Sequence, residues 1–168
     1  MSTMDHAFDL TVAPETIHSE LISEAFLLAF AAEVGVEVDS LTFDGSGDPA
    51  VATMLWRFST ARPGIPELAK RLLPDEVRLS WAQGWAPLVG GEASGTLEVT
   101  LLGRPRASSQ GKSLLRAKGA GATLSTSTAT KASLPFPLAG KVESMVDRDL
   151  VGWILSVQAR VLAGRHPA

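Results

Sequence analysis

Side chains that could carry acid–base or metal chemistry are sparse in this sequence and widely separated. The three histidines, His6, His18 and His166, show no metal-ligand spacing. The chain has no cysteine, which excludes disulfides, thiolate metal sites and thiol catalysis and fits a reducing cytoplasm as well as any other compartment. We therefore expect neither a metal site nor a cofactor.

Glu143 is the carboxylate whose position most invites a functional role, since helical spacing puts it at the edge of an apolar helix side. A half-buried carboxylate there would serve as a general acid or base, or bind a ligand hydroxyl. The structural alternative is an interaction with the helix dipole or with a lysine. An enzyme would need a second polar group on the same pocket, for which Arg57, Arg160 and His18 are the candidates. We predict no catalytic residue.

Two further polar segments bear on binding. The Gly111-Lys112-Ser113 run lacks the glycine five residues earlier that a phosphate-binding loop requires, because Arg106 stands there. The basic segment from 104 to 118 has no interleaved aromatic side chains, which indicates a solvated hairpin and not a nucleic-acid surface.

Serine and threonine alternate through residues 123–130. Either Thr126, Thr128 and Thr130 or Ser125 and Ser127 would face inward and orient an apolar ligand, and the alternative is a solvated strand face. The sequence leaves open which set faces inward.

The elements that position these residues are mostly strands. Period-two alternation predicts strands over residues 5–12, 34–43, 51–61, 77–85, 93–102, 113–118 and 122–134, with helical segments over 14–30 and 66–73. Residues 104–113 break the pattern. Short connections favour antiparallel pairing, because parallel neighbours need long crossovers. The predicted fold class is therefore α+β with about seven antiparallel strands.

In the C-terminal part of the chain, the spacing of apolar residues predicts one long helix over residues 138–162. Pro135 and Pro137 end the last strand, and Gly140 lets the chain turn. A helical wheel of this segment places the apolar residues on one broad side, namely Val142, Met145, Val146, Leu150, Trp153, Ile154, Val157 and Val161. It leaves Lys141, Ser144, Asp147, Arg148 and Gln158 outside that side. Such a helix must bury its apolar side, and the sheet is the surface available to it.

The inward faces of strands and helix together predict a ligand cavity rich in aromatic and methionine side chains, which give apolar pockets area and adaptability. The alternative for each residue is plain core. The predicted lining is Met54, Trp56, Phe58, Leu79, Trp81, Trp85, Leu97, Val99, Thr128, Glu143, Met145, Val146 and Trp153.

Length and charge narrow the class of protein. The 168 residues fit one domain, residues 1–168, with a core at about 4–163. The net charge of −3 gives no reason to expect nucleic acid or an anionic membrane as partner. The longest apolar run, residues 25–32, is too short to span a bilayer, and no secretory signal precedes it. We expect a soluble, cytoplasmic protein.

The order of these elements resembles the helix-grip fold of the START and birch-pollen-allergen-like superfamily, also called SRPBCC or polyketide cyclase-like. More narrowly, the chain is similar to an uncharacterised family of high-GC bacteria, over about residues 4–163. That family has a Pro-X-Pro-hydrophobic-X-Gly-Lys-hydrophobic-Glu run before the final helix. It is matched here by Pro135, Pro137, Leu138, Gly140, Lys141, Val142 and Glu143. The N-terminal strand at 6–11 and the segment IPELAKRLLP also match.

The resemblance implies a curved antiparallel sheet wrapped around the last helix and enclosing a cavity, with short helices near the N-terminus. Superfamily members hold sterols, lipids, polyketides, quinones or plant hormones there, and some catalyse cyclisation. The leading hypothesis is a noncatalytic carrier or sensor of a small hydrophobic molecule such as a lipid, isoprenoid or polyketide. The alternatives are a cyclase-, aromatase- or isomerase-type enzyme and a protein-interaction module, and the resemblance supplies no catalytic residues.

Overall fold

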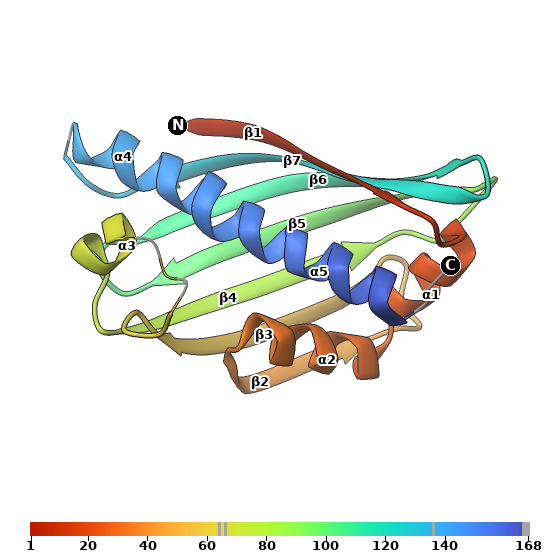
Figure 1. Ribbon diagram of the computed structural model, residues 1–168, viewed down its shortest axis with the longest axis horizontal. Helices are drawn as coiled ribbons and strands as arrows, with labels where there is room; N and C mark the ends of the chain where they lie inside the picture. The colour runs from red at the N-terminus through yellow and green to blue at the C-terminus, as the bar shows by residue number, and fades with distance from the viewer. Residues whose placement is uncertain (64, 66, 136, 166–168) are drawn as a thin grey trace.

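Seven strands form one antiparallel sheet in the computed structural model (Figure 1), which describes residues 1–63, 65, 67–135 and 137–165. The strands are β1 (Ser2–Leu10), β2 (Glu37–Asp44), β3 (Ala50–Ser59), β4 (Glu76–Trp85), β5 (Glu92–Leu102), β6 (Ala107–Lys118) and β7 (Gly121–Ala132). Their order is β1-β7-β6-β5-β4-β3-β2, so the first two strands form opposite edges. Consecutive strands from β2 to β7 pair as a meander, as their short connections predicted.

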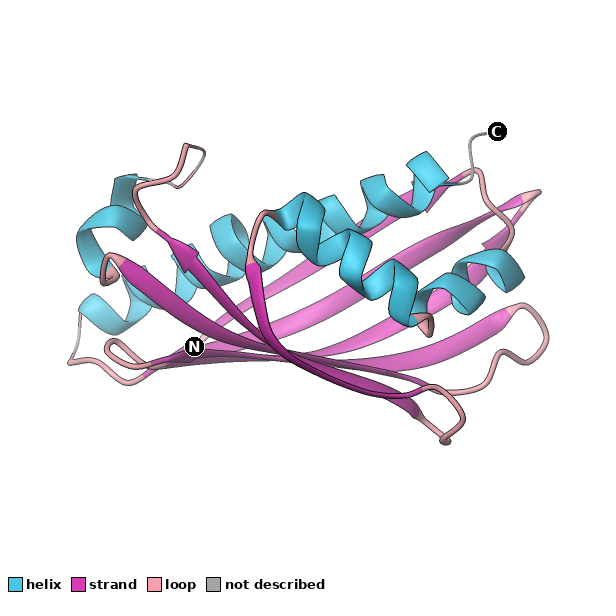
Figure 2. Ribbon diagram, turned by 90° about the horizontal axis from the view of Figure 1, so that it is seen from below, coloured by secondary structure: helices cyan, strands magenta, loops and turns pink. Residues whose placement is uncertain are grey.

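The helices all lie on one side of this strongly twisted sheet (Figure 2). Two helices, α1 (Pro14–Leu21) and α2 (Glu24–Val34), connect one sheet edge to the other, and α3 (Glu67–Leu72) joins β3 to β4. Pro14 stands in the first turn of α1, where its missing N–H costs no hydrogen bond. Gly35 ends α2 with a left-handed φ of 83°.

Several boundaries differ from the sequence prediction. The strand expected from Val34 begins at Glu37, because Val34 is the last residue of α2. The break expected over 104–113 is short, and β6 already begins at Ala107, which pairs with Leu101 and Ala132. The helix expected over 66–73 is α3, with Pro66 outside the described residues. His166 also lies outside them.

Alternation along the strands determines which side chains reach the helix layer. Thr126, Thr128 and Thr130 are buried, whereas Ser127 is exposed and Ser125 half-buried. The threonine set therefore faces inward, which answers the question that the sequence left open. On β1 the same alternation buries His6.

The C-terminal helix crosses the concave side of the sheet as three consecutive segments, α4 (Leu138–Ser144), η1 (Met145–Val151) and α5 (Gly152–Arg165). The middle segment is a π-helix, whose hydrogen bonds span five residues in place of four and which therefore has more residues per turn. The residues after η1 are consequently rotated relative to a uniform α-helical wheel.

The π-helical turn, which contains Asp147 and precedes Trp153 and Gln158, explains three wrong assignments on the wheel. The wheel puts Asp147 and Gln158 outside the apolar side, yet they are 0% and 1% exposed. It puts Trp153 on that side, yet 37% of Trp153 is exposed. Within the described residues, no helix is long and apolar enough to cross a membrane.

Candidate functional site

An aromatic cluster from α2, β3 and β4 occupies the middle of the core. The rings of Trp56 and Trp81 stack with centroids 5.3 Å apart, and Phe30 meets both edge-on at 5.6 and 5.7 Å. All three are fully buried. The Trp56 indole N–H donates to Met54 Sδ at 3.4 Å. Met54, Trp56 and Trp81 were predicted to line a cavity, and in the structure Trp56 and Trp81 pack against each other and against Phe30.

Two indole donors in this core have no acceptor. Nε1 of Trp81 and Nε1 of Trp85 are the buried side-chain nitrogen and oxygen atoms without a hydrogen-bond partner in the part of the chain that the structure describes. Each unsatisfied buried donor costs about 1–3 kcal/mol. Both come from the inward face of β4.

An apolar pocket lies under α3, between that helix, β3 and the C-terminal helix. Its lining includes Phe58, Ile65, Ala69, Leu73, Met145 and Trp153. The volume is about 20 Å³, which has room for roughly one water molecule. The one acid in the lining, Asp149, accepts a hydrogen bond from Arg148 Nε at 3.0 Å. This pocket brings together three of the predicted cavity residues, Phe58, Met145 and Trp153.

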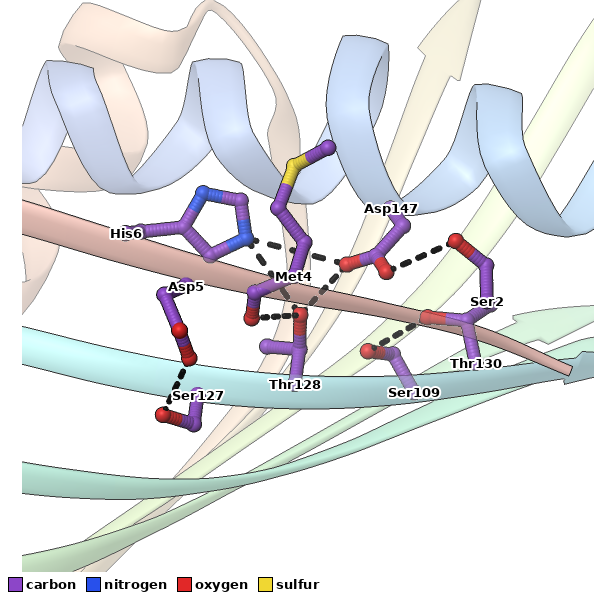
Figure 3. Close-up of polar contacts among 9 residues, drawn as sticks. All are labelled: Ser2, Met4, Asp5, His6, Ser109, Ser127, Thr128, Thr130 and Asp147. Atoms are coloured by element: carbon purple, nitrogen blue, oxygen red, sulfur yellow. Dashed lines mark hydrogen bonds and ion pairs between the residues drawn. The ribbon is translucent and has the colours of Figure 1, made fainter.

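A buried polar seam joins the C-terminal helix to β1 and β7 (Figure 3). The carboxylate of Asp147 accepts hydrogen bonds from Thr128 Oγ1 and, at 3.1 Å, from Ser2 Oγ. Nε2 of His6 lies 3.7 Å from Asp147 Oδ1 and 3.3 Å from Thr128 Oγ1. The three side chains Asp147, Thr128 and His6 are all at least nine-tenths buried. We call Ser2, His6, Thr128 and Asp147 the Asp147 seam.

Neighbouring polar groups are paired as well. Thr126 shares a 2.8 Å hydrogen bond with Ser113, and Thr130 donates to Ser109 at 2.9 Å. The amides of Gln83 and Gln158 are buried and hydrogen-bond to each other, at 2.8 and 3.4 Å. The carboxylate of Glu143, 5% exposed, contacts the amino group of Met1 at 3.0 Å. Glu143 therefore has an ionic partner, but this partner is the Met1 amino group, whereas the structural alternative named the helix dipole or a lysine.

The side chains considered for an enzyme do not converge. Arg57 is on the outer face of β3, where Asp39 and Glu37 raise its pKa. Arg160 is exposed beside Glu33. Neither Arg160 nor Arg57 therefore has the inward position that was considered for it. His18 bonds the carbonyl of Ala86 at 2.8 Å. Among the described residues, no group of three His, Cys, Asp or Glu side chains could hold a metal ion.

Two open depressions lie outside the core. A groove of about 870 Å³ crosses the outer face of the sheet and is lined mainly by small and polar residues such as Thr96, Glu98, Lys112 and Ser127. A crevice of about 600 Å³ lies between α3, the turn after β5 and the start of α4. We call the second one the basic crevice, because its lining includes Arg104 and Arg106.

Of the thirteen residues predicted to line a cavity, all are buried except Trp153. Cavity lining itself stays a prediction for those outside the α3 pocket. The residues that sequence reasoning missed are His6, Gln83, Asp147 and Gln158. For His6 and Gln83 a signal existed, since each shares the inward strand face with apolar neighbours. For Asp147 and Gln158 no signal marked the π-helical segment.

The fold and the buried interior define an α+β protein of the helix-grip class, with the START-like arrangement of a curved sheet around a C-terminal helix. Residues 5–162 match the model of a family described as "Protein of unknown function (DUF2505)", and the chain belongs to this family. A comparison with curated proteins found no match.

Solved structures share the fold at low sequence identity. A protein from Thermus thermophilus is 12% identical with a TM-score of 0.60, covering 98% of this chain and 99% of its own. The protein Ara h 8.0201 is 13% identical with a TM-score of 0.55, covering 96% and 98%. Truncated norcoclaurine synthase from Thalictrum flavum is 9% identical with a TM-score of 0.54, covering 99% and 94%. At such identities the likeness is one of fold.

Proposed function

We propose that this protein binds a small hydrophobic molecule, such as a lipid, isoprenoid or polyketide, between the sheet and the C-terminal helix, and does not transform it. The observation that carries the proposal is the apolar pocket under α3. Its walls are Phe58, Met145 and neighbouring aliphatic side chains, and Trp153 stands half-exposed at its edge. A cytoplasmic location is part of the proposal.

The pocket must enlarge to hold such a ligand, and α3 is the element that can move. Of its six residues only Ala69 is buried. Little apolar area is therefore lost from the core when α3 shifts, since burial contributes about 25 cal/mol per Å².

Catalysis has weaker support than binding. The side chains considered for acid–base chemistry are dispersed, and the Asp147 seam is closed by its own hydrogen bonds. One protein of this fold is by name a synthase, so the fold itself does not decide between carrier and enzyme.

The test is titration with farnesol, a neutral isoprenoid, followed by tryptophan emission and native mass spectrometry. We expect saturable binding of one molecule that is recovered unchanged. Ala69→Phe fills the pocket and should weaken binding at least about tenfold, a loss of about 1.4 kcal/mol. Leu68→Phe, on the exposed side of the same helix, is the control and should bind like the wild type. Absence of bound mass together with unchanged emission across apolar ligands would overturn the proposal, and a chemically altered product would favour the enzyme.

A further inference from the structure

The basic crevice combines an apolar floor with two cationic side chains. Leu72 of α3, Leu134 after β7 and Leu138 of α4 provide the apolar part of the lining, which we call the floor, and Arg104 and Arg106 line the same crevice. Among the residues that the structure describes, its lining contains no acidic side chain. An apolar surface with cations at one side matches an amphiphile, not a purely apolar molecule.

Both arginines are exposed and free of ion pairs within the described residues, unlike several others in the chain. Arg57, Arg116, Arg148, Arg160 and Arg165 each contact a carboxylate. A guanidinium binds a carboxylate or phosphate through two parallel hydrogen bonds, and it is weakly hydrated, so an unpaired pair of them is suited to an anion.

The backbone gives this turn a defined position. The N–H of Ser133 donates to the carbonyl of Arg106 at 2.8 Å, and the next residue, Ala107, is buried and pairs with Ala132. Arg106 is thus tied to the end of β7, where the chain leaves the sheet toward α4. The two cations are therefore presented from the end of the sheet and not from a long free loop.

The crevice and the α3 pocket lie on two sides of the same short helix. Leu72 lines the crevice, whereas Ala69 and Leu73 line the pocket. Both sites thus adjoin one helix whose width with side chains is about 10–12 Å, a length that one extended lipid-like molecule can span.

We propose that the ligand is an amphiphile whose anionic head, a carboxylate or a phosphate, binds Arg104 and Arg106 while its apolar tail enters under α3. This rests on the proposed function and narrows its ligand class. A single bound molecule fits better than docking on an anionic membrane, because membrane recognition by charge uses clusters of about four to eight basic residues.

The experiment compares ligands that share a tail and differ in the head. Farnesyl diphosphate is titrated against farnesol, and hexadecanoate against hexadecanol, with the wild type and with Arg104→Gln/Arg106→Gln. The control variant is Lys112→Gln/Arg116→Gln, which removes the same charge from β6 outside the crevice. We expect the wild type to prefer the anionic member of at least one pair by about tenfold or more, since hydrogen bonds to charged groups are the stronger ones. The pair that shows the preference identifies the head.

The crevice variant should lose that preference and keep the wild-type affinity for the alcohol, whereas the control variant keeps the preference. Equal affinity for both members of both pairs, or a preference that survives in the crevice variant, overturns this inference and leaves the proposed function standing. Binding of none of the four ligands overturns both. Arginine-dependent sedimentation with phosphatidylserine vesicles, without a preference for free anionic ligands, assigns the crevice to a membrane and overturns the inference too.

Discussion

The aromatic cluster and the Asp147 seam join the same concave sheet face to the helix layer by different physical means. In the cluster, Trp56, Trp81 and Phe30 remove large apolar surfaces from water through contacts that tolerate small shifts. In the seam, a carboxylate is held by hydroxyl donors whose distances and directions are fixed. Burial therefore provides most of the stability, and the seam determines the position of the helix along the sheet.

The seam also depends on the π-helical turn. Asp147 lies within η1, and its carboxylate reaches Ser2 on β1 and Thr128 on β7. The changed residue count per turn directs this polar side chain toward the sheet edge while Met145 and Val146 stay in the core. Consecutive residues of one helix can in this way contact both the polar seam and the apolar core.

The largest expected effect is in the cluster. Trp81→Ala should lower the free energy of unfolding by about 3–5 kcal/mol, because a fully buried ring leaves a cavity. Trp153→Ala, a change of the same chemistry at a half-exposed position, should cost only about 1 kcal/mol. Guanidinium chloride unfolding of both variants measures the difference, and equal costs would show that the core does not depend on the cluster.

An intermediate effect is expected in the seam. Thr128→Val removes a hydroxyl that donates to the buried Asp147 carboxylate, and hydrogen bonds to charged groups are worth about 1.5–3 kcal/mol. Thr126→Val, on the same face of β7, breaks a bond to the neutral Ser113 and should cost about 0.5–1.5 kcal/mol. If urea unfolding ranks the two variants in the opposite order, the seam has no special role.

The smallest effect concerns Asp9, an exposed carboxylate on the same strand as His6. The Lys118 ammonium and the Thr123 hydroxyl, which donate to it at 3.0 and 2.9 Å, hold the pKa of Asp9 below its ordinary value of 3.8. Because the folded-state pKa is the lower one, its contribution to stability is present above pH 3.8 and is lost as the pH falls through the folded value.

Carboxyl ¹³C NMR measures this titration directly. Lys118→Ala should move the Asp9 midpoint up toward 3.8, since the larger of the two hydrogen-bond contributions is removed. A midpoint already at 3.8 in the wild type would contradict the prediction.

Much of the fold was predictable because its signals are local. Period-two alternation identified the strands and the inward position of Trp56, Trp81 and Leu97, and Pro135 and Pro137 marked the end of the last strand. The first residues of β2 and β6 were less predictable. Val34 has strand propensity but is buried as the last residue of α2, so packing outweighed propensity there.

The sequence by itself determined an antiparallel sheet, a long C-terminal helix and an apolar interior, since alternation, helical spacing and proline act within a few residues of the chain. Only the tertiary structure decided that Asp147 and Gln158 turn inward, that Trp153 turns outward, and that Arg104 and Arg106 stand beside the same apolar floor as Leu72. These facts depend on a π-helical turn and on contacts between distant segments. No local pattern encodes either of them, because both are selected by the packing of the whole chain.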